Sequence, residues 1–203
     1  MEKKFNQVFQ FKITLKGIRP PIWRRIQVPE FYTFWELHVA IQDAMDWLDY
    51  HLHQFEMKNP FTGKQTLIGL PADDYDWSRN TLPGWEQKIG LWFTPQNNLA
   101  LYTYDFGDNW EHKVQLEKIL PREREIKYPI CLSGKRACPP EDCGGVPGYY
   151  ELLEIIKNPA DERYEETKMW LGRKYDPEYF NPKKVIFDDP DIRFRRAFDD
   201  ETQ

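Results

Sequence analysis

The 203-residue sequence lacks the segments that direct a protein into or across a membrane. No run approaches about 18 consecutive apolar residues, so a membrane-spanning helix is not expected. The N-terminal Met-Glu-Lys-Lys-Phe-Asn carries charges with no apolar run behind them, so no signal peptide is expected either. Cysteine is scarce, with three residues, which is an odd number for a disulfide framework. We therefore expect a cytoplasmic protein with no membrane partner.

An excess of positive charge is also missing. The formal net charge is −5, which argues against a general nucleic-acid binder, because such binding depends on clustered positive charge. Short basic clusters do occur, at Arg24-Arg25, at Lys135-Arg136 and at the C-terminal Arg193, Arg195 and Arg196. They leave open a role as a nucleic-acid accessory protein, although such clusters are more often solvated faces.

Aromatic residues are abundant, at 16% of the chain, and their pattern predicts a central β-hairpin over Leu99–Leu120. One face of its first strand carries Ala100, Tyr102, Tyr104 and Phe106, and the matching face of its second strand carries Trp110, His112, Val114 and Leu116. Gly107-Asp108 between the strands suits a tight turn. A lone two-stranded ribbon is marginal in water, so the other elements are expected to cover this aromatic surface.

The rest of the pattern predicts an α+β fold. Alternating apolar residues predict strands at Phe9–Leu15, Ile22–Val28, His51–Met57 and Gln65–Leu70. Helices are expected after the capping box Thr33–Glu36, from Pro147 and after Asp161, whereas residues 71–85 and 121–147 resemble loops. Because strands and helices are not regularly interleaved, we expect a mostly antiparallel sheet with helices packed on one face. Residues 1–180 are expected to form a single domain, and residues 181–203 an extension of short helical or irregular pieces.

Two histidines and the hairpin supply a candidate site for a divalent metal. His51 and His53 are two residues apart on one predicted strand, a spacing by which paired imidazoles can bind one ion. Asp105, Asp108 and His112 can complete a mixed nitrogen and oxygen set if the two elements meet. A metal held there would acidify a water molecule and support hydrolysis. The alternative is that these imidazoles form hydrogen bonds within an aromatic core or at its rim.

A second group of residues is expected to bind a ligand, and it consists of Arg24, Trp110, Arg136, Glu141 and Asp142. Glu141 and Asp142 follow two prolines, so they occupy a stiff loop that can bind a cation or the polar end of a ligand. The alternative is that Arg136 pairs with one of these carboxylates and fixes the loop on the sheet. Arg24 shares a predicted strand face with apolar residues, so it is expected either at a sheet edge or paired with a carboxylate.

The spacing of the three cysteines leaves open whether they bind a metal, form a disulfide or remain free thiols. Cys138 and Cys143 are five positions apart, and Cys131 lies seven positions before Cys138. Zinc sites usually take four ligands at tighter paired spacing, so buried free thiols or an incidental disulfide are the alternatives.

Five separate stretches, in order, resemble the Ri-plasmid open-reading-frame-three-like proteins. They are Ile18-Arg-Pro-Pro-Ile-Trp-Arg-Arg25, Leu37-His38 with Ile41-Gln42, His51-Leu-His-Gln-Phe55, Tyr104-Asp-Phe-Gly-Asp-Asn-Trp-Glu-His112 and Ala137-Cys-Pro-Pro-Glu-Asp-Cys-Gly-Gly145. The resemblance covers about residues 9–180. It implies an α+β domain of bacteria and archaea, often encoded beside mobile elements, with no agreed activity and no catalytic residues to carry over. Some members are labelled transposon resolvases.

The residues do not support recombinase chemistry. A serine recombinase needs an early nucleophilic serine, and the chain has only Ser78 and Ser133. A tyrosine recombinase of the usual kind has a His-x-x-Arg pair, and none of the four histidines is followed by arginine at the third position. The sequence therefore favours a non-catalytic binding or interaction module with an unknown protein or ligand partner, and a metal-dependent hydrolase is the competing interpretation.

Overall fold

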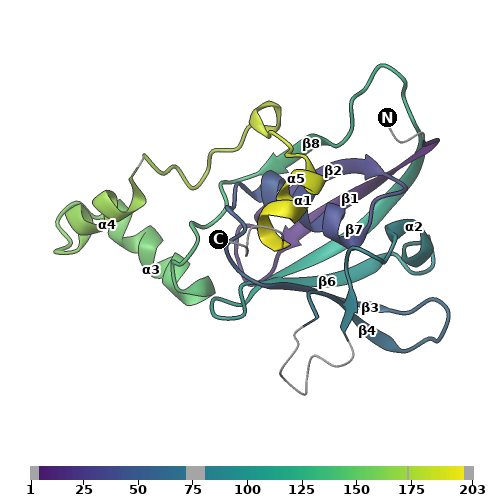
Figure 1. Cartoon of the computed structure of the whole chain (residues 1–203). Coiled ribbons are helices and arrows are strands. Elements are labelled where there is room, and N and C mark those ends of the chain that lie inside the picture. Colours follow the sequence, from purple (N-terminus) through teal and green to yellow (C-terminus); the bar gives the residue numbers. More distant parts are fainter. Residues whose placement is uncertain (1–4, 72–80, 173, 199–203) are drawn as a thin grey trace.

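The computed structural model describes residues 5–71, 81–172 and 174–198, and its centre is one eight-stranded sheet (Figure 1). The strands are β1 (Gln7–Leu15), β2 (Trp23–Pro29), β3 (His53–Lys58), β4 (Gln65–Gly69), β5 (Thr81–Pro83), β6 (Leu99–Tyr104), β7 (Trp110–Pro121) and β8 (Ile130–Lys135). Their spatial order is β5-β4-β3-β6-β7-β1-β2-β8. Every neighbouring pair is antiparallel except β4 and β5. The predicted α+β class with a mostly antiparallel sheet is confirmed.

The β6–β7 hairpin occupies the middle of this sheet. Tyr104 pairs with Trp110 and Tyr102 with His112, and all four side chains are buried. The register therefore places the two aromatic faces on the same side of the sheet, as the alternation predicts. Phe106 is the exception, because it lies in the hairpin loop beyond the last paired residues and is 42% exposed.

Helix α1 (Phe34–Met45) packs against the buried face of the sheet and begins at the predicted capping box. The Thr33 hydroxyl accepts a hydrogen bond from the Glu36 amide, and the Glu36 carboxylate accepts one from the Thr33 amide at 2.6 Å. Asp46 ends the helix in the left-handed conformation. The buried face of the helix therefore stops at Met45, and Leu48, which lies beyond the end of the helix, is 64% exposed.

Five further helical segments complete the described fold. They are α2 (Ile89–Trp92), α3 (Gly145–Lys157), α4 (Tyr164–Leu171), the 3₁₀ turn η2 (Pro182–Lys184) and α5 (Pro190–Phe198). Helices α3 and α4 extend away from the sheet, whereas α5 lies beside α1 (Figure 1). The Trp35 ring of α1 meets the Phe194 ring of α5 edge-on, with ring centroids 5.4 Å apart. Among the described residues, no helix combines the length and apolar character needed to cross a membrane.

Four local predictions are wrong. The strand predicted from His51 begins at His53, so His51 lies in the preceding loop. β5 and β8 fall in segments predicted as loops, and β8 pairs along β2 with a register shift between Arg25 and Ile26. The residue that caps α4 is Arg163 rather than Asp161, whose carboxylate instead accepts a hydrogen bond from the Arg163 amide. Part of the predicted 71–85 loop, residues 72–80, lies outside the described residues. The division of the chain at residue 180 stays a prediction.

Candidate functional site

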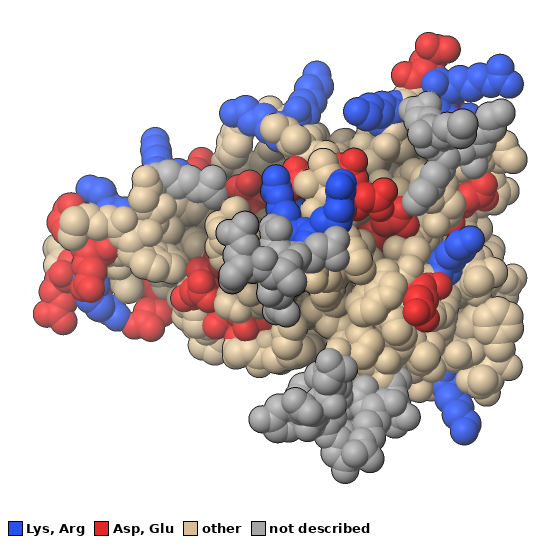
Figure 2. Space-filling view, in the orientation of Figure 1, with Lys and Arg blue, Asp and Glu red and all other residues tan. Residues whose placement is uncertain are grey.

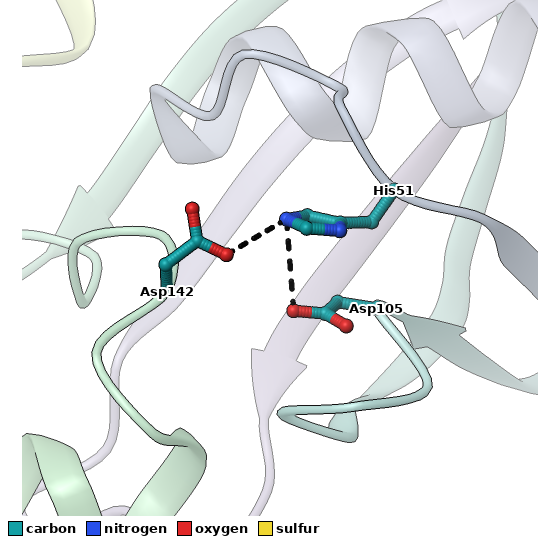
Figure 3. Close-up of side chains that lie close together, drawn as sticks. All are labelled: His51, Asp105 and Asp142. Carbon is teal, nitrogen blue, oxygen red and sulfur yellow. Dashed lines mark ion pairs between the residues drawn. The ribbon is translucent and has the colours of Figure 1, made fainter.

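Three loops bring one imidazole and two carboxylates together at one end of the sheet (Figure 3). His51 lies between α1 and β3, Asp105 begins the β6–β7 loop, and Asp142 precedes α3. The His51 Nε2 atom is 3.0 Å from an Asp142 carboxylate oxygen and 3.8 Å from an Asp105 oxygen. One nitrogen and two oxygens thus lie within 4.8 Å of one another, the arrangement of a small metal-binding cluster.

The neighbouring carboxylate Glu141 holds two of these loops in place. It accepts hydrogen bonds from the Tyr104 hydroxyl and, at 2.8 Å, from the Leu48 amide. The same tyrosine oxygen accepts a hydrogen bond from the Tyr50 amide at 3.0 Å. Because Glu141 thereby connects the loop that carries His51 to the loop that carries Asp142, we assign it a positioning role.

The hairpin loop and the loop before α3 also make direct contact. The Gly144 amide donates to an Asp108 carboxylate oxygen at 3.1 Å. Gly145 adopts a φ of 66°, and a Cβ atom at this position would lie only 2.5 Å from the Asp108 carbonyl oxygen. Asp108 therefore supports the contact between the loops, and Gly145 permits their close approach.

Both carboxylates of the cluster come from residues with left-handed backbone. Asp105 has a φ of 55° and Asp142 a φ of 58°. One Asp105 oxygen accepts a hydrogen bond from the Gly107 amide at 2.8 Å, so the other oxygen faces His51. Strained backbone of this kind persists where the surrounding structure holds it and is common at binding sites.

The His51 ring is well placed to bind a cation. Its Nε2 atom is shielded from solvent and has no aligned hydrogen-bond partner among the described residues, despite the short distance to Asp142. The Asp142 side chain is 64% exposed, so solvent reaches the cluster from that side. The nitrogen thus lies between two carboxylate oxygens, and in the neutral ring it can serve as a ligand atom.

The structure places the other predicted metal ligands elsewhere. His53 is buried and stacks on His38 with ring centroids 3.4 Å apart, and burial, followed by the charge of His38, holds its pKa well below the usual value. His112 is fully buried, and desolvation lowers its pKa to about 3. His53 and His112 therefore lie within the aromatic core, which was the alternative interpretation of these imidazoles. An Asp108 carboxylate oxygen accepts the hydrogen bond from the Gly144 amide, so this residue belongs to the loop contact.

The predicted ligand-binding arginines have structural partners. Arg24 is neither at a sheet edge nor paired with a carboxylate: its guanidinium donates to the carbonyl oxygens of Ala44, Trp23 and Lys135. It also lies 3.7 Å from the centroid of the Phe180 ring. Arg136 pairs with Glu178 at 2.8 Å and donates to the Pro20 carbonyl, so the expected pairs with Glu141 or Asp142 are not formed.

The remaining ligand candidate, Trp110, belongs to the core. Its side chain is fully buried, and the indole Nε1 atom has no hydrogen-bond partner among the described residues. The ring packs near Trp47, with centroids 6.0 Å apart, so its place in the structure is a packing position.

The basic clusters considered for nucleic acid are also largely neutralised. Arg25 pairs with Glu117 at 2.6 Å, and Arg193 pairs with Asp43 at 2.7 Å. On the face shown in Figure 2, Lys and Arg side chains are scattered among carboxylates rather than gathered in a stripe. On this face the described residues therefore form no basic stripe that favours the accessory role.

The cysteines are free thiols that belong to no metal cluster among the described residues. Burial raises the pKa of Cys131 to about 11, that of Cys143 to about 12, and that of Cys138 further. Thiols that resist ionisation are poor nucleophiles and poor ligands in this state.

A buried network, which the residue pattern did not indicate, lies behind the cluster. The Gln42 side-chain amide donates to the Tyr102 hydroxyl at 2.8 Å, and His38 Nδ1 lies 2.8 Å from the same oxygen. In the neutral ring protonated at Nε2, the Tyr102 hydroxyl donates a hydrogen bond to Nδ1, and Nε2 donates one to Asp49 at 2.8 Å. The spacing of His38 and Gln42 on one face of α1 is the signal that was available.

Comparisons with known proteins agree on one family. The sequence model described as Plasmid pRiA4b ORF-3-like protein matches residues 7–184. The chain is 34% identical over 168 residues to the "Uncharacterized protein y4hQ" of Sinorhizobium fredii, covering 81% of each chain. It is 55% identical to a protein of unknown function, MM3350 from Methanosarcina mazei Go1, whose crystal structure matches with a TM-score of 0.84 over 91% of this chain and 100% of that one.

Proposed function

The chain belongs to the plasmid pRiA4b ORF-3-like family, and we propose that it is a binding protein for a divalent transition-metal ion held by His51, Asp105 and Asp142. The proposal assigns a metal ion as the ligand of the binding module that the sequence predicts. It retains His51 and Asp105 from the predicted metal set and takes Asp142 from the predicted ligand-binding set.

The observation that carries the proposal is the spacing of the three donor atoms. Ligand atoms around one zinc ion lie roughly 3 to 3.5 Å apart, because each is about 2 Å from the metal. The His51–Asp142 distance of 3.0 Å already meets this spacing, and the His51–Asp105 distance of 3.8 Å requires only a small shift. The His51 side chain is 31% exposed and that of Asp105 only 11%, so the shift falls to the imidazole ring.

The donor set also indicates which ions fit. One imidazole nitrogen with two carboxylate oxygens suits zinc, manganese or iron(II), whereas magnesium and calcium prefer oxygen donors alone. Glu141 and Asp108 hold the loops without contributing ligand atoms, which corresponds to the supporting shell of a metal site.

Isothermal titration of the metal-stripped protein with zinc or manganese chloride tests the proposal. We expect one ion per chain, and we expect His51→Ala and Asp142→Asn each to weaken binding by about 100-fold or more, since each removes a ligand. Glu154→Gln removes an exposed carboxylate remote from the cluster and serves as the matched control. Absence of binding, or equal binding by His51→Ala, would refute the proposal.

Hydrolysis by a metal-bound water is a second candidate function. It is favoured by the small number of protein ligands, because three ligands leave positions for water and substrate. Cleavage of p-nitrophenyl acetate by the metal-loaded protein, lost in His51→Ala, would support it. Equal rates for the two proteins would leave the site a binding site only.

A further inference from the structure

We propose that the groove between α3 and α4 binds a basic peptide segment of a partner protein, one that presents a lysine or arginine beside an apolar side chain. This inference goes beyond metal binding and does not depend on it.

The groove is an open hollow of about 340 Å³. Leu152 and Ile155 line it from α3, and Trp170 lines it from α4. No residue of α4 is buried, and Leu171 is the one α4 residue among the partly buried hydrophobic residues packed against the described core. Asp142 of the metal cluster also lines the groove, so the two sites are neighbours.

The charge around the groove favours a cationic occupant. Over residues 151–171 the sequence has six carboxylates and three basic side chains. Each of the three bases is already paired: Lys157 with Glu154, Arg163 with Glu151 and Asp161, and Lys168 with Glu165. In Figure 2, acidic side chains gather at the end of the molecule formed by α3 and α4.

Glu166 is the carboxylate that a ligand cation would meet. It lines the groove and forms no ion pair with another described residue. Arg163 is the one base in the lining, and it is occupied by Glu151 and Asp161. A lysine or arginine from a partner would therefore find an unneutralised carboxylate in the groove.

Trp170 supplies the aromatic surface that such a ligand also needs. Its side chain is 50% exposed, although tryptophan usually buries most of its surface. An exposed indole attracts a cation to its ring face and covers the apolar stem of a lysine or arginine. Since Leu152 and Ile155 are apolar, the neighbouring ligand residue is expected to be apolar too. A nucleic acid would instead be repelled by the carboxylates.

Fluorescence anisotropy with labelled octapeptides tests this inference on the full chain, with EDTA present so that no metal contributes. We expect an alternating leucine–lysine peptide to bind and an alternating leucine–glutamate peptide not to bind. Trp170→Ala and Glu166→Lys are each expected to weaken binding by about tenfold or more, which is a modest loss for one anchor residue. Because α4 has no buried residue, both variants are expected to fold, and circular dichroism checks this.

Two matched controls make the result specific. Met169→Ala removes an equally apolar, 75% exposed side chain from the same helix that does not line the groove, and it is expected to bind as the parent does. His51→Ala is expected to lose metal but retain the peptide, so failure of one proposal is distinguishable from failure of the other.

Four outcomes would overturn the inference. They are no binding of the leucine–lysine peptide, equal binding of the leucine–glutamate peptide, unchanged affinity in Trp170→Ala and Glu166→Lys, and a dimer in sedimentation experiments that Trp170→Ala dissociates. The last would assign the groove to a second copy of this chain.

Discussion

The imidazole rings of His38 and His53 stack face to face in the buried layer between α1 and β3, with centroids 3.4 Å apart and planes 9° from parallel. His38 Nδ1 lies 2.8 Å from the Tyr102 hydroxyl and Nε2 lies 2.8 Å from an Asp49 oxygen, so both ring nitrogens have a partner. Burial disfavours a charge on His53, and charge on His38 would add repulsion at this distance, so the stack favours a neutral His53.

Stability is therefore expected to fall as the pH drops below about 6.5. The folded-state pKa values of His53 and His112 lie below their unfolded values, so the unfolded chain binds more protons in this range. For His112 the window extends from about 6.5 to about 3. Each histidine contributes a slope of about 1.4 kcal/mol per pH unit. Urea unfolding at pH 7.5, 6.5 and 5.5 measures this, and a constant free energy of unfolding would contradict it.

The Tyr102 hydroxyl is expected to stabilise the fold by about 1–3 kcal/mol. Tyr102→Phe leaves the Gln42 amide and the His38 Nδ1 atom without their shared partner in a fully buried setting. Tyr179→Phe is the control, because Tyr179 is 50% exposed and its loss should stay within about 0.5 kcal/mol. Chemical denaturation compares the two variants, and equal midpoints would show that the network does not stabilise the protein.

Trp110→Ala is expected to be far more damaging than Cys143→Ala. Trp110 is fully buried at the end of the β6–β7 hairpin, and its removal leaves a cavity costing about 3–5 kcal/mol. Cys143 is a smaller and only partly buried side chain. Thermal melts followed by circular dichroism provide the comparison. Similar melting temperatures would count against the central place of the hairpin.

Glu141→Gln is expected to weaken metal binding although Glu141 is not a ligand. The substitution removes the charge of the carboxylate that accepts hydrogen bonds from the Tyr104 hydroxyl and the Leu48 amide. The loops that carry His51 and Asp142 are then held less firmly. Supporting residues of this kind typically contribute about 10- to 100-fold in affinity. Zinc titration of Glu141→Gln beside the Glu154→Gln control measures the effect. Parent-like affinity would show that Glu141 does not position the site.

Local signals account for the parts of the fold that were predictable. The Thr33–Glu36 capping box and the alternation around Gly107 act over a few residues, and both elements form as expected. Strand β8 was missed because Ile130–Lys135 has no alternating pattern. It becomes a strand by satisfying the free backbone groups of β2, and it does so with a register shift.

The candidate site was only partly predictable for the same reason. His51 and His53 were assigned to one strand face, but β3 begins at His53, so the two-residue period does not reach His51. The loop before the strand includes left-handed backbone at Asp49, which does not fit a strand period. Arg136 pairs with Glu178, which is 42 residues away, and no local pattern indicates such a contact. The convergence of His51, Asp105 and Asp142 likewise depends on tertiary structure.

Anomalous diffraction from crystals soaked in manganese or zinc chloride tests the metal site most directly. The proposal predicts one peak between the imidazole of His51 and the carboxylates of Asp105 and Asp142, at about 2.0–2.2 Å from each ligand atom. The peak should vanish in His51→Ala crystals soaked in the same way. A peak at another place, or none in the parent crystals, would contradict the proposal.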